Sequence, residues 1–488
     1  MGDRLKNLID GNWVDSANSA TFDDTNPANK TDVLGSFPRS DHRDIDRAVE
    51  AARSAFPAWS VCPSMRRAEI LYKAAHIIEE RSDDLSAVIV RETGKVLAEA
   101  QMELRDGVST LRAIAGDGSR LAAEASSPDR AGTVVLATPV PLGVAGVITH
   151  WTFPLAGSLW AVGSALAAGD TVVLKPAEDT PLTAARLVEI LLEAGLPPAS
   201  ICLVHGHGEE AGAPLVRHPD VALVSFAGSS EVGREVAITC AAEGKRLCLD
   251  LGEETVAIVL EDADLDVAVE SVVGAGFAVA GQRWRGAARL FVQRKALKEF
   301  SERVIASVQA LRLGDGMSAA TDIGPIINEI QLKRVHGHTR IGLRDGAKLL
   351  CGGEVVKEGE CKRGFFYAPT VFGDVVLKMR LVQEDVLGPM LALMSVVSLE
   401  EAVQQANTLR RATTTAVFTR DIARGFRAIE GLRAGRVYVN PTPPSRGAPL
   451  SLTGFSPPSS VRRRVGPQNL FDFQAWKEAV IDSVGQRP

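Results

Sequence analysis

The sequence predicts an α/β fold with two doubly wound α/β domains and a separate β-ribbon. Two observations lead to this prediction. Between residues 143 and 260, short apolar segments alternate with longer helical segments, which is typical of a parallel sheet with helices on both faces. Residues 133–142, which precede them, are β-branched and interrupted by proline, and they indicate an edge ribbon rather than a central strand.

The composition is that of an ordinary globular protein of several domains. The chain has 488 residues, a hydrophobic fraction of 45%, a charged fraction of 23% and a net charge of −6. Neither nucleic acid nor a membrane is therefore an expected partner. The most apolar stretch, residues 154–169, is shorter than the roughly 20 residues of a membrane span. Six cysteines form no C-x-x-C motif, which favours reduced thiols, a cytoplasmic location and no structural metal.

The N-terminal part of the chain predicts a hairpin followed by helices. Residues 7–15 contain Asp10-Gly11, a strong two-residue turn signal. Helices are expected between residues 41 and 111, where apolar residues recur with a helical period. Ser82 is expected to cap one of these helices, with acidic residues in its first turn. One predicted helix face carries Ile70, Leu71, Ala74, Ile77 and Ile78.

The rest of the chain predicts two successive α/β halves. The second half is expected from residues 256–260 to about residue 440. Residues 441–458 are rich in Pro and Ser and predict a loop or extended segment, and residues 476–481 predict a final strand. In the first half, strands are expected at residues 143–149, 171–175, 201–204, 223–226 and 247–250, and helices at residues 154–168 and 183–193.

Two features at strand ends are compatible with a bound nucleotide. Residues 226–233 form a glycine-rich turn that follows an apolar strand and opens a helix, so backbone N–H groups and the helix dipole would face an anion. Turns between a strand and a helix also use glycine for steric reasons. The turn alone therefore does not distinguish a nucleotide site from a turn that needs glycine only for packing. Lys175 and Glu178 end another strand at the same sheet edge. They are suited to hold the hydroxyls of a ribose, or else they form an exposed ion pair.

Several spaced segments carry a resemblance to a known family: Trp151-Thr152-Phe153-Pro154, Leu174-Lys175-Pro176-Ala177-Glu178, residues 226–233, Asp250-Leu251-Gly252, Gly281-Gln282-Arg283 and residues 384–389. In this order they resemble the aldehyde dehydrogenase superfamily, from about residue 7 to residue 481. The resemblance implies an oligomerisation ribbon that pairs with a partner's sheet, and hence a homodimer or homotetramer. The implied ranges are 1–118 and 142–253 for a Rossmann-like cofactor-binding domain, 254–453 for a catalytic-type domain, and 119–141 with 454–488 for the ribbon and C-terminal tail.

The resemblance also implies a site for NAD or NADP, with weakened or lost binding left open. Asp385 stands where the family usually has Glu on the nicotinamide ribose, and its shorter side chain weakens that contact without forbidding it. By resemblance, the cofactor-binding residues are Lys175 and Glu178 at the adenosine ribose, Ser229 with Gly228 and Gly233 at the pyrophosphate, Trp151 at the nicotinamide, and Asp385.

The chain departs from the family at the positions that carry its chemistry. Trp284, which has no nucleophilic atom, replaces the nucleophilic cysteine. Thr152 replaces the Asn that stabilises the oxyanion, and Asp250 replaces the general-base Glu. Loss of the nucleophile costs on the order of 10⁶ in kcat, and loss of one oxyanion donor about 10² to 10³ more. Three further departures are Gly252-Glu253 in place of Gly-Gly, Leu387 in place of an aromatic residue, and Pro449-Leu450-Ser451-Leu452 in place of Pro-Phe-Gly-Gly.

Substitutes for the missing groups have little support in the sequence. Cys248 shares a strand face with the base position and is a candidate displaced nucleophile, but ordinary strand packing is the better-supported interpretation. His205 and His207, and likewise His336 and His338, could offer two metal ligands each. No third ligand follows from their spacing, so we expect loop histidines and no metal.

Two hypotheses for the function follow. The first is a pseudoenzyme that lacks thiol-dependent aldehyde oxidation and has a structural, partner-binding or cofactor-sensing role. The second, from a different class, is an active NAD(P)-dependent aldehyde oxidoreductase, or a different reaction that uses Asp250 and Thr152. Measured turnover in the presence of NAD or NADP separates the two.

Overall fold

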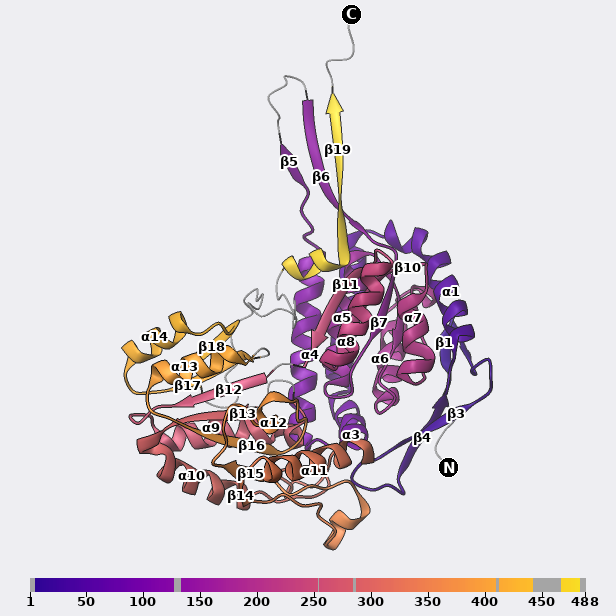
Figure 1. The fold of residues 1–488 in the computed structure, drawn as a ribbon. Coiled ribbons are helices and arrows are strands. Elements are labelled where there is room, and N and C mark those ends of the chain that lie inside the picture. The colour runs from indigo at the N-terminus through magenta and orange to yellow at the C-terminus, as the bar shows by residue number, and fades with distance from the viewer. Residues whose placement is uncertain are drawn as a thin grey trace, which may run out of the picture.

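The computed structural model describes residues 5–126, 133–252, 254–283, 287–409, 412–441 and 467–482. In these ranges the chain forms two seven-stranded sheets covered by helices, a three-stranded ribbon and a two-stranded hairpin. The ribbon projects from the half of the molecule that holds the first sheet, and the second sheet with its helices lies beside that half (Figure 1). The predicted α/β fold class is confirmed.

The first sheet has the strand order β11-β10-β7-β8-β9-β1-β2. Strands β7 to β11 are parallel, and the hairpin of β1 and β2 continues the sheet in antiparallel fashion. The strands are β1 (Asn7–Ile9), β2 (Asn12–Val14), β7 (Val144–Ile148), β8 (Thr171–Lys175), β9 (Ile201–Leu203), β10 (Val221–Gly228) and β11 (Arg246–Leu251). The helices of this half are α1 (His42–Ser60), α2 (Ser64–Glu80), α3 (Ser82–Thr93), α4 (Leu97–Gly118), α5 (Pro154–Ala168), α6 (Pro181–Glu193), α7 (Ala213–Arg217) and α8 (Ser230–Ala242).

The strands of the first sheet are apolar along their whole length because helices cover both faces. In β7, Ala145 and Val147 belong to the core that includes α2, α4, α5 and α6. Val144 and Ile148, which point to the opposite face, belong to the core that includes α1, α7 and α8. The uninterrupted apolar runs in the sequence were therefore a correct indication of a doubly covered parallel sheet.

The second sheet has the strand order β14-β15-β16-β13-β12-β17-β18, parallel except for β14. Its core lies between the sheet and its helices on both sides. The strands are β12 (Glu254–Val259), β13 (Ala287–Gln293), β14 (Lys348–Cys351), β15 (Thr370–Gly373), β16 (Met390–Val396), β17 (Ala412–Phe418) and β18 (Arg436–Val439). The helices are α9 (Leu265–Phe277), α10 (Arg294–Gln309), α11 (Glu329–Arg344), α12 (Arg380–Gln383), α13 (Leu399–Thr408) and α14 (Ile422–Gly431).

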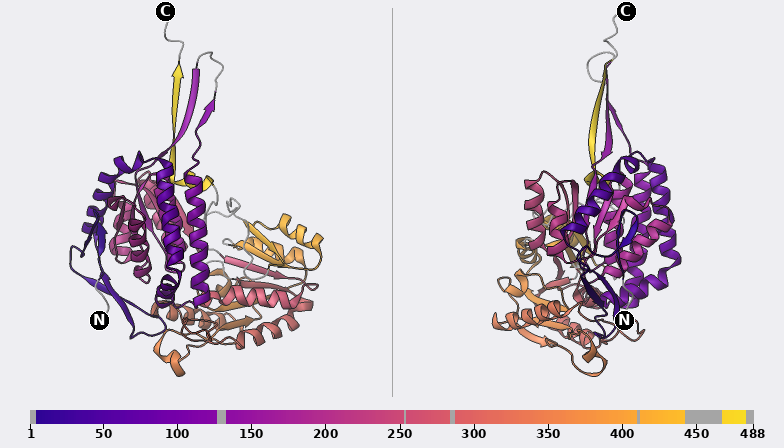
Figure 2. Two further views of the ribbon diagram at one scale, coloured as in Figure 1. Left: turned by 180° about the vertical axis from the view of Figure 1, so that it is seen from behind. Right: turned by 90° about the vertical axis from the view of Figure 1, so that its right-hand side faces the viewer.

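The ribbon consists of β19 (Gln474–Asp482), β6 (Thr133–Pro141) and β5 (Glu124–Ser126), in that order. It extends well away from the helices in every view (Figure 2). The prediction of a ribbon is confirmed, but the prediction that residues 133–142 form an edge strand is wrong, because β6 lies in the middle. β5 pairs only with residues 135–137 of β6. The prolines at 139 and 141 lie beyond this pairing, where one side of β6 has no neighbouring strand and a missing N–H costs little.

The other expectations for the elements have mixed outcomes. The hairpin at residues 7–15 and the final strand are confirmed, and β3 (Thr21–Thr25) and β4 (Val33–Pro38) form a second hairpin. The expected Ser82 cap is wrong, because α3 begins at Ser82 itself and Arg81, which alone separates α2 from α3, makes no side-chain cap bond. Residues 442–458 of the expected loop lie outside the described residues. The domain limits stay a prediction.

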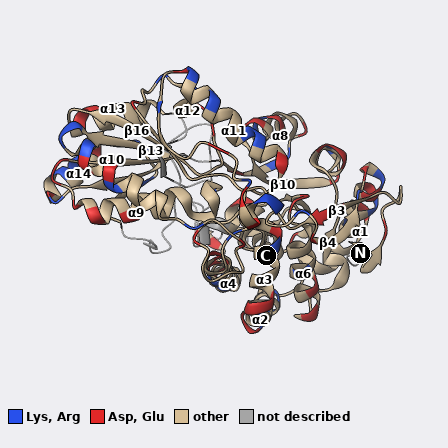
Figure 3. Cartoon of the chain, turned by 90° about the horizontal axis from the view of Figure 1, so that it is seen from below, with Lys and Arg blue, Asp and Glu red and all other residues tan. Residues whose placement is uncertain are grey.

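The helices and the surface charges of the described residues bear on the expected partners. No helix in these ranges is both long and apolar enough to cross a membrane. Seen from below, Lys and Arg are interspersed with Asp and Glu on α10, α11 and α14 (Figure 3). The prediction from net charge, that nucleic acid is not an expected partner, is compatible with this distribution.

Candidate functional site

The candidate site lies at the carboxyl edge of the first sheet. Ile148, the last residue of β7, pairs with Lys175 on one side and with Phe226 on the other, and Ala227 pairs with Asp250. The ends of four parallel strands therefore bring the segments after residues 148, 175, 228 and 250 to one edge. This is the edge at which doubly wound sheets bind their ligands.

On one side of this edge, a carboxylate is held between two nitrogen-bearing side chains. Lys175 Nζ lies 3.3 Å from Glu178 Oε2, and His207 Nδ1 lies 3.9 Å from Glu178 Oε1. Burial raises the pKa of Glu178, but the charge of Lys175 and hydrogen bonds outweigh it, so that the pKa lies below its ordinary value. The alternative of a fully exposed ion pair is wrong, because Lys175 is only 2% exposed.

The buried ammonium group of Lys175 has unused hydrogen-bonding capacity. An ammonium group has three donors. Among the described residues, the carboxylate of Glu178 is the only acceptor that Lys175 Nζ contacts. A buried cation with spare donors, beside a half-exposed carboxylate, is suited to bind hydroxyl or phosphate oxygens of a ligand.

The glycine-rich turn joins β10 to α8. Ser229 is the N-cap of α8 and its hydroxyl accepts from Val232 N at 3.3 Å. A Cβ on Gly228 would lie 2.4 Å from the ring of Phe226, and a Cβ on Gly233 would lie 2.3 Å from the side chain of Leu251. Packing therefore accounts for both glycines. The suitability of the turn for an anion rests on the free N–H groups at the start of α8.

On the other side of the edge, a buried ion pair supports the loop between β7 and α5. Lys95 Nζ donates to Glu103 Oε2 at 2.5 Å and to the carbonyl oxygen of Thr152 at 2.9 Å. Glu103 Oε1 accepts from Leu155 N at 2.8 Å and Ala156 N at 3.1 Å, which satisfies two N–H groups at the start of α5. Both side chains of the ion pair are fully buried. This network fixes the backbone that carries Thr152.

The hydroxyl of Thr152 contacts an imidazole that the sequence did not single out. His150 Nδ1 accepts from Thr152 N at 3.1 Å and also contacts Thr152 Oγ1. Which of the two atoms donates in the contact with Oγ1 depends on the tautomer of His150. Burial lowers the pKa of His150 to about 3, so its ring is neutral at pH 7. The hydroxyl of Thr152 is thus in contact with a side chain of the protein, while an oxyanion would require its proton to point at substrate.

A turn with three successive left-handed residues precedes the position of Trp284. Val279, Ala280 and Gly281 have φ values of 54°, 53° and 68°, and such a conformation costs roughly 1–3 kcal/mol at each non-glycine residue. Glu99 Oε1 accepts from Val279 N at 2.7 Å, and burial raises the pKa of this carboxyl. A Cβ on Gly281 would lie 2.1 Å from the carbonyl oxygen of Gly388, so only glycine fits there.

Gln282 anchors the end of this turn. Its Nε2 donates to the carbonyl oxygens of Val279 and Pro325, both at 3.2 Å, and its Oε1 accepts from Ile327 N at 2.9 Å. The guanidinium of Arg283 lies 5.9 Å from the centre of the Phe153 ring. The turn and the loop that carries Thr152 are therefore adjacent, as the family resemblance implies.

The remaining predicted site residues lie around the same edge, in part outside the described residues. Asp250 is the penultimate residue of β11 and is buried, and Asp385 Oδ2 lies 3.6 Å from the position of a Cβ on Gly252. Asp385, from the half with the second sheet, is thus close to the strand that carries Asp250. Trp151 is half-buried and its ring centre lies 4.6 Å from that of His150. The positions outside the described residues are Glu253, Trp284 and residues 449–452.

All six cysteines of the sequence lie in the described ranges, and four of them are buried. Cys248 is 2% exposed and packs in the core of the first sheet, where strand packing was expected. Burial raises the pKa of Cys202 to about 11, and it also raises the pKa values of Cys240, Cys351 and Cys361. Reactive cysteines have lowered pKa values, so these thiols have the opposite character.

The histidine pairs are placed differently from the prediction. His205 and His207 follow β9 in a loop, as expected, but His336 and His338 lie in α11, so the prediction of a loop is wrong for them. Their Nδ1 atoms contact the hydroxyl of Tyr367 and the carbonyl oxygen of Arg334. In the part of the chain that the structure describes, no group of three or more His, Cys, Asp or Glu side chains is arranged to hold a metal.

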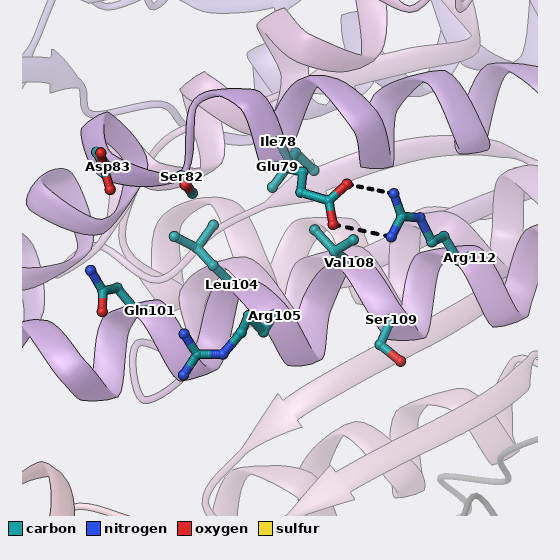
Figure 4. A pocket seen from close by; sticks show the side chains of 10 residues that line it. All are labelled: Ile78, Glu79, Ser82, Asp83, Gln101, Leu104, Arg105, Val108, Ser109 and Arg112. Atoms are coloured by element: carbon teal, nitrogen blue, oxygen red, sulfur yellow. Dashed lines mark hydrogen bonds and ion pairs between the residues drawn. The ribbon is translucent and has the colours of Figure 1, made fainter.

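A groove of about 540 Å³ lies elsewhere, between α4 and the helices α2 and α3. Figure 4 shows Leu104 and Val108 between the helices and the two hydrogen bonds that join Glu79 to Arg112 across the groove. Its ten lining residues all lie between Ile78 and Arg112. Because none of them belongs to the carboxyl edge, this groove is not part of the candidate site.

Sequence reasoning missed four residues of the site, Lys95, Glu99, Glu103 and His150, and considered His207 only as a possible metal ligand or loop histidine. Lys95 lies just before α4, and Glu99 and Glu103 follow it at intervals of four residues. This spacing places charged side chains on the same side of the helix. Such a row of charges among apolar residues was the signal that could have identified them. His150 adjoins the segment that contains Thr152, but nothing in the sequence distinguishes a histidine that bonds two residues onward from a solvated one.

The chain is similar to proteins of one family over nearly its whole length. A model described as "Aldehyde dehydrogenase family" matches residues 13–478. The chain is 35% identical over 475 residues to the alpha-ketoglutaric semialdehyde dehydrogenase of Bacillus subtilis (strain 168), and the match covers 97% of each.

Solved structures give the same result. A point mutant of betaine aldehyde dehydrogenase from Staphylococcus aureus, in complex with NAD⁺, has a TM-score of 0.95 at 31% identity, with 99% of this chain and 98% of that chain covered. HpcC from Thermus thermophilus has a TM-score of 0.93 at 35% identity, with coverages of 99% and 94%.

Proposed function

Because the chain belongs to the aldehyde dehydrogenase family, we propose that it keeps the nucleotide cleft of that family and lacks thiol-dependent aldehyde oxidation. In this proposal it is a pseudoenzyme with a structural, partner-binding or cofactor-sensing role. The observation that carries the proposal is Trp284, which follows Gly281-Gln282-Arg283 in the sequence, at the position of the nucleophile. An indole forms no covalent bond with an aldehyde carbon.

The surroundings of that position support the proposal. Burial raises the pKa values of four of the six thiols, and the hydroxyl of Thr152 contacts His150 Nδ1. Loss of the nucleophile alone corresponds to about 8 kcal/mol of barrier, which the remaining groups of the site do not replace. Lys95 and Glu103 hold the loop of Thr152 in place whether or not chemistry occurs there.

The nucleotide side fits a bound NAD or NADP. We propose that Lys175 and Glu178 bind the adenosine ribose and that the start of α8, with Ser229, binds the pyrophosphate. The spare donors of Lys175 Nζ support this assignment, as do the relatives whose structures are described as complexes with NAD⁺. When bound, the nicotinamide is a hydride acceptor. Trp151 and Asp385 are the proposed residues on the nicotinamide side.

Calorimetric titration with NAD⁺ and NADP⁺, followed by absorbance of the reduced cofactor with a panel of aldehydes, tests the proposal. We expect binding without turnover. Turnover above about 1 s⁻¹, near the low end of ordinary enzymes, would contradict it. Absence of binding would instead leave a purely structural role, without cofactor sensing.

The alternative is an active NAD(P)-dependent aldehyde oxidoreductase, which the names of the similar proteins favour. A different reaction that uses Asp250 and Thr152 is a further alternative, since a hydroxyl beside a neutral imidazole is an arrangement that enzymes also use for nucleophiles. Turnover that is lost in both Thr152→Val and Asp250→Asn, but kept in Trp284→Ala, would identify that reaction.

We further propose that the ribbon mediates formation of a homodimer or homotetramer. Val134, Trp476, Val480 and Ile481 on the ribbon are between 41% and 60% exposed, and no other described segment covers the ribbon. Exposed apolar strands of this length are typical of contacts between subunits. We expect Val480→Asp with Ile481→Asp to lower the molar mass measured by light scattering, while a monomeric wild-type protein would contradict the proposal.

A further inference from the structure

We propose that His207 is a specificity-determining residue that controls the choice between NAD and NADP at the adenosine ribose. This inference rests on the proposed function, because it requires that a dinucleotide binds at Lys175 and Glu178. It goes beyond that proposal by assigning a role to a side chain for which the sequence predicted only a loop position.

His207 lies beside Glu178, the carboxylate proposed to bind the adenosine ribose, and this ribose carries the only difference between the two cofactors. The carboxylate of Glu178 has two oxygens, of which Oε2 faces Lys175 Nζ at 3.3 Å and Oε1 faces His207 Nδ1 at 3.9 Å. The ring of His207 is also held by Phe22, with ring centres 5.3 Å apart. Lys175 is the last residue of β8, and His207 lies in the loop after β9. Because β8 and β9 are neighbours in the sheet, their ends bring both side chains to this carboxylate.

The chemistry of the two cofactors differs only at the 2′ position of this ribose. NAD has a hydroxyl there, which donates a hydrogen bond to a carboxylate. NADP has a phosphate, which a carboxylate repels and a cation attracts. Glu178 alone therefore favours NAD. The ring nitrogens of His207 lie beside this carboxylate, and a cation at the same position would neutralise the carboxylate and attract the phosphate.

The other charged groups around His207 leave Glu178 as its main partner. Glu210 lies close to His207 but is held by Arg39, whose Nε and Nη2 donate to it at 2.7 Å and 2.5 Å. Asp179 accepts from the amide of Asn328 at 2.9 Å, and burial raises its pKa to about 6. Both carboxylates thus have partners of their own, and the positive charge of Lys175 is already shared with Glu178.

His207 is partly exposed to solvent. Its side chain is 37% exposed and that of Glu178 is 39% exposed. An exposed ion pair is worth up to about 1 kcal/mol, which corresponds to roughly a fivefold change in affinity. We therefore expect a fivefold effect on the ratio of NADP to NAD affinity, and little effect on NAD itself.

The test compares affinities of NAD⁺ and NADP⁺ by calorimetry, at one pH, in the wild type and in two variants. His207→Asn should bind NAD⁺ as the wild type does and should lower the affinity for NADP⁺ relative to NAD⁺ by up to about fivefold. His207→Lys, which adds a cation beside Glu178, should raise the affinity for NADP⁺ relative to NAD⁺ by about fivefold.

His76→Asn is the matched control, because His76 is 65% exposed, pairs with Glu80 on α2 and lies far from the site in the sequence. Titration with 2′,5′-ADP and 5′-AMP repeats the comparison without the nicotinamide. If both cofactors bind and their ratio is the same in His207→Asn, in His207→Lys and in the control, the inference is wrong and the proposed function stands. If neither binds to the wild type, the cofactor-sensing role and the inference are both wrong.

Discussion

Two buried lysines on either side of the cleft are satisfied in opposite ways. Lys95, on the reaction side, donates to Glu103 and to the carbonyl of Thr152, and its ammonium group lies 4.6 Å from the centre of the Phe153 ring. Lys175, on the nucleotide side, contacts Glu178 alone among the residues that the structure describes. The two are similarly buried, at 1% and 2% exposure. The difference teaches that Lys95 stabilises the fold, whereas Lys175 has donors available for a ligand.

The largest expected effect comes from restoring the reaction side while the nucleotide side is left unchanged. We expect Trp284→Cys with Thr152→Asn and Asp250→Glu to raise aldehyde-dependent reduction of NAD⁺ or NADP⁺ by at least about 100-fold, because loss of a nucleophile costs on the order of 10⁶ in kcat. Absorbance of the reduced cofactor measures the rate. The control is Trp284→Ala in the same background. A triple variant that binds cofactor and stays inert would show that residues 449–452 also prevent the reaction.

Removal of Lys95, whose ammonium group has two acceptors within the protein, should cost the most stability. We expect Lys95→Met to lower the free energy of unfolding by about 3–5 kcal/mol, because it leaves Glu103 buried without its cation. Urea unfolding followed by circular dichroism measures the loss. Arg112→Met breaks an ion pair whose side chains are 43% and 52% exposed, and should cost about 1 kcal/mol or less. Equal losses in the two variants would contradict the distinction between the lysines.

Removal of Lys175, whose ammonium group contacts only the carboxylate of Glu178 among the described residues, should instead lower cofactor affinity. We expect Lys175→Met to weaken binding of NAD⁺ by about 10- to 100-fold, since hydrogen bonds from a charged donor contribute about 1.5–3 kcal/mol. Its effect on stability should be smaller than that of Lys95→Met, because Glu178 is partly exposed and remains solvated. Calorimetric titration and urea unfolding give both quantities. Unchanged affinity would remove the case for a ribose site.

The smallest effect concerns pH and sharpens the description of the nucleotide side. Burial raises the folded-state pKa of Asp179 to about 6, above an unfolded value of about 3.9. Its contribution to stability is therefore fully present below about pH 4 and is lost as the pH rises through 6. We expect Asp179→Asn to become more stable relative to the wild type between pH 4 and pH 7, by about 2 kcal/mol, because most of a rise of about two pKa units takes effect over this range and one unit corresponds to about 1.4 kcal/mol.

Urea unfolding of both proteins across this pH range checks the prediction. A stability difference between Asp179→Asn and the wild type that stays constant with pH would mean that Asp179 is ionised at pH 4 in the folded protein.

The sequence predicted the architecture better than it predicted the site. Continuous apolar strands and the turn at Asp10-Gly11 depend on local patterns, and β7, β8 and α5 lie where these patterns placed them. The position of β6 in the middle of the ribbon depends on β19, more than 300 residues away in sequence, so no local pattern revealed it.

Within the site, the motif order predicted residues that lie at the carboxyl edge of the first sheet but gave no information about their contacts. The hydrogen bond between Thr152 and His150 depends on side-chain rotamers, and the contact of His207 with Glu178 depends on the convergence of two strands. The structural role of Lys95 and the ligand-binding role proposed for Lys175 likewise follow only from the acceptors that each ammonium group contacts. Composition and spacing carry no such information.

The turn that ends at Gly281 receives its support from Glu99, from Gln282 and from the backbone at Gly388. These contacts, all with described residues, stabilise its shape. A backbone supported in this way tolerates exchange of the side chain that follows it. In evolutionary terms, the reactive position can drift once selection for turnover is relaxed, while selection for the folded subunit continues to preserve everything around it.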